Sequence, residues 1–205
     1  MTRQKKPLIL GLTGPIGAGK STIAQMFAKR GFPIFSSDLY VHELLSKDPP
    51  TIAKIEKKIP QAVVGGTVDR ALLAQHVFNN PSQRVWLEKI IHPAVFKAIR
   101  SFIATAKEKG NKGVILEIPL LFETGYESQC DLTLCVVANA IVQKARVMKR
   151  QGMSPSTYRR IKASQLSDCE KKKRADYVIQ NSSTKRAAEK QVEALIEKVW
   201  GKDHA

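Results

Sequence analysis

Residues 14–21 read Gly14-Pro15-Ile16-Gly17-Ala18-Gly19-Lys20-Ser21, and with Thr22 after them they fit the phosphate-loop pattern G-x-x-x-x-G-K-[ST]. The glycines of this pattern let the backbone turn tightly and aim successive N–H groups at phosphate oxygens. Lys20 adds a positive charge that reaches the β- and γ-phosphates, and the Ser21 hydroxyl can bind Mg²⁺. We therefore predict that the loop binds a nucleotide through residues of this stretch: Gly14, Gly17, Ala18, Gly19, Lys20, Ser21 and Thr22.

The sequence on either side of the loop predicts a strand before it and a helix after it. Residues 8–12 form a short apolar run, LILGL, of the kind found in strands that are buried on both faces. Ile23, Met26 and Phe27 then recur on one helical stripe. The N-terminus of that helix would add its own N–H groups and dipole to an anion site. This context favours a phosphate site over the plainer alternative, a glycine-rich turn with a surface lysine.

Composition limits the classes of protein that remain. The chain has 205 residues, 43% hydrophobic and 25% charged, and no window approaches the roughly 20 apolar residues of a membrane span. Three cysteines without a C-x-x-C pair suggest neither a disulfide framework nor a zinc site, so we expect a reducing, cytoplasmic location. The formal net charge of +16 indicates anionic partners, either nucleotides or nucleic acids.

A second short strand is expected at residues 32–35, followed by Ser36-Ser37-Asp38. The carboxyl ends of parallel strands line the ligand crevice of an α/β sheet, so Asp38 would lie on the same edge as the phosphate loop. A carboxylate there can act as a base or a metal ligand. Asp38 could also simply cap the helix expected over residues 39–45, because Asp is a preferred N-cap residue.

Residues 46–112 are predicted to be a helical insertion without strands. Turn signals punctuate it, among them Gly65-Gly66. A residue before proline is driven away from the helical region, so His92, before Pro93, is expected to mark a helix end or a kink. Arg70 and His92 could each hold an anionic substrate, although a structural role is the more common one for an isolated residue of either type.

Further strands are expected at residues 113–118, 132–137 and 176–179, and Glu117 lies at the end of the first of these. Phosphate-loop enzymes keep a magnesium carboxylate at such a strand end, although Glu117 could instead face solvent. Residues 144–174 hold eleven basic residues against two acidic ones. A run of basic residues is usually a solvated face, and it can also bind nucleic acid. A single-strand binder is expected to offer several aromatic side chains for stacking, whereas Tyr158 is the single aromatic residue of this segment. We therefore favour a third interpretation, a mobile lid that closes over a triphosphate.

With these pieces assembled, the chain resembles the dephospho-coenzyme A kinase family over almost its whole length. Several blocks besides the phosphate loop carry the resemblance, and their order is specific: Asp69-Arg70, Leu87-Glu88-x-Ile90-Ile91-His92-Pro93, Pro119-Leu120-Leu121-Phe122-Glu123, Arg160-Ile161-x-x-x-Gln165 and Ala175-Asp176-Tyr177-Val178-Ile179-x-Asn181. One departure stands out. The family commonly reads Asp-Ala-Asp where this chain has Ser36-Ser37-Asp38, so the second aspartate is kept and the first is not.

The resemblance implies a P-loop, nucleotide-kinase-like α/β fold, with a five-stranded parallel sheet flanked by helices. Residues 1–45 and 113–205 would form the nucleotide-binding core, with a lid at about 144–174, and residues 46–112 would bind the acceptor. The implied reaction is transfer of the ATP γ-phosphoryl group to the ribose 3′-hydroxyl of dephospho-CoA, the last step of coenzyme A biosynthesis. The implied partners are thus ATP, Mg²⁺ and dephospho-CoA, with no obligatory nucleic acid and no membrane.

The resemblance also implies roles for individual residues. Asp38 would deprotonate the 3′-hydroxyl, and Lys20 would span the β- and γ-phosphates. Ser21 would hold Mg²⁺, with Glu117 acting through water. Four further residues would contact substrates: Arg146 or Arg150 the phosphates on lid closure, and Arg70 and His92 the dephospho-CoA.

Two alternatives stay open at this point. One is a nucleoside or nucleoside-monophosphate kinase of the same fold, and the other is a nucleic-acid-binding ATPase, which the net charge of +16 would suit. A GTPase is weaker, because Asn111-Lys112-Gly113-Val114 begins like the guanine-reading Asn-Lys-x-Asp motif but has Val in place of Asp.

Overall fold

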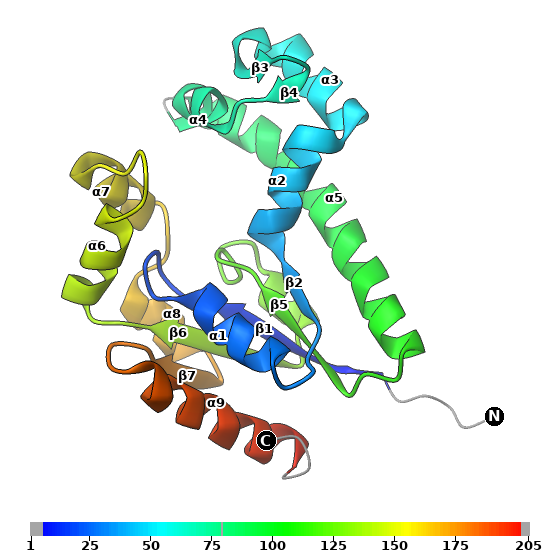
Figure 1. Cartoon of the computed structure of the whole chain (residues 1–205). Coiled ribbons are helices and arrows are strands. Elements are labelled where there is room, and N and C mark those ends of the chain that lie inside the picture. The colour runs from blue at the N-terminus through cyan, green and yellow to red at the C-terminus, as the bar shows by residue number, and fades with distance from the viewer. Residues whose placement is uncertain (1–5, 79, 202–205) are drawn as a thin grey trace. The chain divides into compact units, whose positions relative to one another are not determined.

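The computed structural model describes residues 6–78 and 80–201, which divide into two compact units (Figure 1). One unit combines the chain before residue 36 with the chain after residue 102, and the other is residues 36–102. Both boundaries fall earlier in the chain than the bounds expected for the insertion, 46 and 112, and the second lies inside a long helix.

The first unit is built on a five-stranded sheet with the strand order β2-β5-β1-β6-β7. The pairs β1–β5, β1–β6 and β6–β7 are parallel. The five-stranded parallel sheet expected from the sequence is confirmed, and its strands lie within about two residues of the expected ranges. Their bounds are Leu8–Thr13 for β1, Ile34–Ser36 for β2, Gly113–Glu117 for β5, Leu132–Val137 for β6 and Tyr177–Gln180 for β7.

The central strands are held by burial of apolar side chains on both faces. All five residues of β5 and the last five of both β1 and β6 are buried, which is the pattern expected for parallel strands covered by helices. Helices α1 (Lys20–Ala28) and α9 (Lys185–Trp200) contact each other and the sheet, and α8 (Asp168–Arg174) contacts β6. Figure 1 shows α1 and α9 in front of the sheet. Phe27, Leu134 and Ile196 lie in the hydrophobic cluster between these layers.

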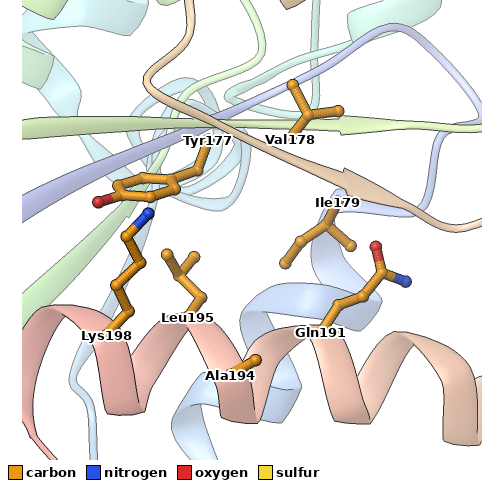
Figure 2. Close-up of a pocket in the computed structure, with 7 residues that line it drawn as sticks. All are labelled: Tyr177, Val178, Ile179, Gln191, Ala194, Leu195 and Lys198. Carbon is orange, nitrogen blue, oxygen red and sulfur yellow. The ribbon is translucent and has the colours of Figure 1, made fainter.

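Strand β7 forms one edge of the sheet, and side chains of α9 cover it (Figure 2). The Gln191 carboxamide accepts a hydrogen bond from the Gln180 backbone N–H at 2.9 Å and donates to the Gln180 carbonyl at 3.0 Å. The Lys198 ammonium lies 5.0 Å from the centroid of the Tyr177 ring. An unpaired edge strand can template association with other chains, and Gln191 satisfies the backbone groups through which such pairing at Gln180 would occur.

The unit of residues 36–102 is mainly helical but holds one small hairpin. Strands β3 (Val63–Val64) and β4 (Thr67–Val68) pair antiparallel across Gly65 and Gly66, whose φ angles are +58° and +77°. Positive φ at both central residues is what a two-residue hairpin turn of type I′ requires. The expectation of an insertion without strands is therefore wrong, although its turn was located correctly. The helices of this part of the chain are α2 (Ser37–Lys47), α3 (Pro49–Lys58), α4 (Arg70–Phe78) and α5 (Pro81–Glu108).

Helix α5 continues through Pro93, so His92 does not mark a helix end. Ile91, Val95 and Ile99 are buried at a spacing of four residues across the proline, whereas the proline ring itself is exposed. Burial of this stripe outweighs the hydrogen bond that Pro93 cannot donate, because each fully buried aliphatic side chain contributes roughly 1.5–3 kcal/mol. The expected helix end at His92 is therefore wrong, and a kink there stays a prediction.

The basic segment 144–174 spans parts or all of three helices. They are α6 (Ala140–Met148), α7 (Pro155–Ala163) and α8. The break between α6 and α7 falls at Gln151-Gly152-Met153-Ser154, where the glycine and proline signals predicted a division between two helices. Among the described residues, no helix is both long and apolar enough to span a membrane.

Candidate active site

The phosphate loop connects the end of β1 to the start of α1, as the sequence predicts. Gly19 is the N-cap of α1 with φ +91°, a conformation that a residue with a side chain rarely adopts. A Cβ atom at this position would lie 2.2 Å from the Asn181 side-chain nitrogen, and one at Gly14 would lie 2.1 Å from the Val136 carbonyl oxygen. Glycine is therefore required at both positions, because neighbouring segments press against the loop.

Lys20 is the first residue of α1, and its ammonium group turns back over the loop. Its Nζ donates to the Gly14 carbonyl at 2.8 Å and to the Pro15 carbonyl at 3.2 Å. These bonds hold the charge on the loop itself, next to the N–H groups of the helix N-terminus. The cradle thus combines a fixed cation with backbone donors, which suits a polyphosphate.

Ser21 and Glu117 are brought together from positions 96 residues apart in the sequence. The Ser21 hydroxyl donates to Glu117 Oε1 at 2.7 Å. Glu117 ends β5, pairs in register with Leu12 of β1, and is 6% exposed, so the interpretation that it only faces solvent is wrong. A hydroxyl and a carboxylate are the oxygen ligands that Mg²⁺ prefers. The described residues contain no group of three or more His, Cys, Asp or Glu suited to a metal.

Arg146 of α6 supports the loop from behind its carbonyl groups. Its guanidinium donates to the carbonyls of Ala18 at 3.2 Å, Gly17 at 3.5 Å and Asn181 at 2.9 Å. The Asn181 side chain donates in turn to the Ala18 carbonyl at 2.8 Å. The sequence had singled out Asn181 only as part of a family block; its contact with the loop depends on a strand end 163 residues away and carries no local signal.

Arg150 lies just beyond the end of α6 and is exposed. Within the described ranges, its guanidinium takes part in no hydrogen bond or ion pair. The two arginines therefore differ in setting, since Arg146 is bonded to the loop and Arg150 faces solvent.

Ile16 connects the loop to the basic segment. Its side chain is 8% exposed and packs in a small hydrophobic cluster with Val147 of α6 and Tyr158 of α7. Its backbone N–H donates to Gln165 Oε1 at 3.2 Å. Gln165 was also known from the sequence only as the last residue of a family block.

Asp38 lies in the unit of residues 36–102, in the first turn of α2. The N-cap of this helix is Ser36, which has an extended backbone, and no side chain caps the helix through a hydrogen bond. The interpretation of Asp38 as an N-cap is therefore wrong. Its carboxylate is exposed and follows the last residue of β2 by two positions.

Arg70 and His92 belong to the same unit. Arg70 is the exposed first residue of α4, and the helix is capped by the residue before it, Asp69, which accepts from the N–H groups of Ala71 and Leu72. His92 stacks against Phe96 one turn later in α5, with ring centroids 5.8 Å apart. The structure thus places Asp38, Arg70 and His92 in the unit of residues 36–102. The other unit contains the phosphate loop, Glu117, Arg146 and Arg150.

Two of the cysteines, Cys130 and Cys135, are poorly suited to nucleophilic chemistry. Burial, the largest cause, raises the pKa of Cys135 in β6 to about 11 and that of Cys130 to about 12. Both thiols stay protonated, and a protonated thiol is a poor nucleophile.

A glycine-rich loop between a parallel strand and a helix, with a lysine and a hydroxyl–carboxylate pair beside it, defines the class of the P-loop nucleotide-binding proteins. A family model described as dephospho-CoA kinase matches residues 8–186. The chain belongs to the dephospho-CoA kinase family.

Individual relatives agree with this assignment. The chain is 41% identical over 194 residues to a dephospho-CoA kinase of Mesorhizobium japonicum, covering 95% of this chain and 98% of the relative. It is 37% identical over 190 residues to one of Rhodopseudomonas palustris, covering 93% and 94%. A solved structure from Thermus thermophilus superimposes with a TM-score of 0.84 at 34% identity, covering 96% of this chain and 100% of that one.

Proposed function

We propose that the protein transfers the γ-phosphoryl group of ATP to the ribose 3′-hydroxyl of dephospho-CoA, giving CoA and ADP. The observation that carries this proposal is the family match over residues 8–186, which includes the phosphate loop and the acceptor-side blocks. The two relatives described above, which are 37% and 41% identical to this chain over more than nine tenths of its length, are both named dephospho-CoA kinase.

The phosphate loop forms the donor half of the site. Phosphoryl transfer passes through a loose transition state, so positioning and charge stabilisation provide most of the catalysis. Backbone N–H groups of the phosphate loop hold the phosphates, and Lys20, which its bonds to the Gly14 and Pro15 carbonyls keep on the loop, spans the β- and γ-phosphates. Arg146 keeps the loop in shape through its bonds to Gly17 and Ala18. Arg150, whose guanidinium faces solvent, is the arginine that meets the transferring group.

Ser21 and Glu117 fit a magnesium ion by the chemistry of their donor set. The Ser21 hydroxyl would bind the ion directly, and the Glu117 carboxylate would orient one of its water ligands. When bound, the ion neutralises charge on the β- and γ-phosphate oxygens.

The unit of residues 36–102 supplies the acceptor half. Asp38 accepts the proton of the 3′-hydroxyl as that oxygen attacks the γ-phosphorus. The Asp38 side chain is exposed in the first turn of α2, where a substrate hydroxyl can reach it. Arg70 and His92 help to bind the anionic acceptor.

An acceptor panel tests the proposed reaction. The protein is incubated with ATP and Mg²⁺ plus dephospho-CoA, adenosine, AMP or single-stranded DNA, and ADP release and the mass of each acceptor are followed. We expect a phosphate to be added to dephospho-CoA with kcat/KM at least about 100-fold above that of any other acceptor, since a pantetheine-bearing substrate offers much more binding energy. Phosphorus NMR shows that the new phosphate is on the 3′ oxygen.

Two results would contradict the proposal. Faster phosphorylation of adenosine or AMP would assign the chain to the nucleoside or nucleoside-monophosphate kinases. ATP hydrolysis that DNA stimulates, with no phosphate on dephospho-CoA, would assign it to the nucleic-acid-dependent ATPases, for which the net charge of +16 is the motive.

A further inference from the structure

The connection between α7 and α8, residues 164–167, reaches the phosphate loop through one side chain. Gln165 Oε1 accepts from the Ile16 backbone N–H at 3.2 Å, across 149 residues of sequence. Gln165 is half-buried, and the Ile16 side chain beside this bond is held among Val147 and Tyr158. The hydrogen bond therefore lies in a packed region and not in a freely moving loop.

The same peptide group connects Gln165 to Lys20. The N–H of Ile16 and the carbonyl of Pro15 belong to one peptide unit, which is planar, so the direction of the N–H fixes the direction of the carbonyl. The Pro15 carbonyl accepts from Lys20 Nζ at 3.2 Å and from the Ala18 N–H at 3.2 Å. Gln165 thus sets the orientation of an oxygen atom that holds the Lys20 ammonium.

An ion pair between a fully buried lysine and a partly buried glutamate fixes the far side of the connection. The Leu166 N–H donates to Glu123 Oε1 at 2.8 Å, and the same oxygen lies 2.9 Å from Lys171 Nζ. The Lys171 side chain is 0% exposed and also donates to the Pro119 carbonyl at 2.8 Å. Gln165 therefore extends from a rigid support, which is what a side chain needs in order to hold another group in place.

We propose that Gln165 is a positioning residue for Lys20, acting through the Pro15–Ile16 peptide. This inference rests on the proposed role of Lys20 at the β- and γ-phosphates. Gln165 lies between α7 and α8 and is hydrogen-bonded to the phosphate loop. The position of these two helices therefore affects the conformation of the loop. Without the bond to Gln165 the peptide can rotate, and the lysine loses one of the two carbonyl oxygens that hold its ammonium group on the loop.

Replacement of Gln165 by methionine tests the proposal. Methionine has about the same length and is at most a weak acceptor, so Gln165→Met removes the hydrogen bond with little change in volume. We expect kcat to fall about tenfold, because the lysine charge acts mainly in the transition state. The KM for dephospho-CoA should stay within twofold of its original value. Gln25→Met is the matched control, since Gln25 is exposed on α1 and its side chain makes no hydrogen bond to a described residue; it should keep full activity.

A double-mutant cycle separates positioning of Lys20 from a general structural effect. Lys20→Met and Lys20→Met/Gln165→Met are compared in single-turnover reactions at high enzyme concentration. If Gln165 acts through Lys20, the double variant is as slow as Lys20→Met alone. A further tenfold loss in the double variant would show that the two residues act independently, and it would overturn the inference.

The two hypotheses fail in different ways. If the protein without substitutions does not phosphorylate dephospho-CoA, the proposed function is refuted. An active original protein and an equally active Gln165→Met variant would refute only the role of Gln165. Urea unfolding of each variant shows whether a loss of activity reflects loss of the folded state.

Discussion

Asp38 occupies the first turn of a helix without capping it. An aspartate there gains a modest benefit from the helix dipole, about 0.3–1 kcal/mol, which a cap hydrogen bond would increase. The chain gives the cap position to Ser36 and leaves Asp38 exposed. This distribution suits a carboxylate whose partner is a substrate.

Replacing Asp38 by asparagine should abolish most of the catalysis and little of the ATP binding. Asparagine keeps the shape of the side chain but cannot accept the 3′-hydroxyl proton, and general-base catalysis contributes about 10²–10⁴-fold. We expect kcat to fall by at least about 100-fold in steady-state assays, with the Kd for ATP from calorimetry nearly unchanged. Glu43→Gln is the matched control, because Glu43 is exposed on the same helix and pairs only with the exposed Lys47 among the described side chains. Unaltered turnover in Asp38→Asn would refute the base assignment.

At the scale of single residues, the sequence predicts those parts of the site that have a local motif. The loop residues and Glu117 follow from their positions beside short apolar runs. Gln165 and Asn181 do not, since each acts by bonding to loop backbone about 150 residues away, at Ile16 and Ala18. Such contacts depend on the order of the strands and leave no pattern in the nearby sequence.

Helix α8 is anchored by the pair of Lys171 and Glu123. Lysine is almost never fully buried unless it is paired, and here the ammonium has a carboxylate at 2.9 Å and the Pro119 carbonyl at 2.8 Å. Breaking a buried pair leaves one charge uncompensated, which costs about 3–5 kcal/mol. This pair therefore adds a strong tertiary contact to a helix of only seven residues.

Lys171→Met should lower the free energy of unfolding by about 3 kcal/mol, as measured by urea denaturation. Lys172→Met, one residue along and exposed, should change it by less than about 0.5 kcal/mol. The double variant Lys171→Met/Glu123→Gln should be less destabilised than Lys171→Met alone, since it leaves no unpaired charge. Equal effects of Lys171→Met and Lys172→Met would contradict the importance of the buried pair.

At the scale of elements, continuous apolar strands can be predicted from the sequence. Very short strands cannot, nor can helices that continue through a local helix-breaking residue. The central strands read as continuous apolar runs. The two-residue strands β3 and β4 are too short to show a period, so only their glycine turn was visible. The proline in α5 is a local signal that the buried stripe of Ile91, Val95 and Ile99 overrides.

The whole molecule carries a formal net charge of +16, and both proposed substrates are polyanions. A positive field should raise the rate of encounter with such ligands, and salt screens it, with a Debye length of about 10 Å at 0.1 M. We expect kcat/KM for dephospho-CoA to fall about fivefold between 0.02 and 0.3 M KCl, with kcat changing less. Sucrose at equal osmolality is the control and should have no such effect. A kcat/KM that is independent of salt would mean that the net charge does not steer the substrates.

Strand β1 has consequences for the protein during its synthesis. It leaves the ribosome long before both of its neighbours, since Leu8 pairs with Gly113 and Leu10 with Leu132. At about 5–20 residues per second, translation leaves this apolar strand without its partners for roughly 5–20 seconds. The intervening residues 36–102 are contiguous and can form their own contacts in that interval. The nascent chain thus has an unpaired apolar strand on the N-terminal side of a helical unit that is already folding. Chaperones that shield extended apolar segments would protect the chain from aggregation at this stage.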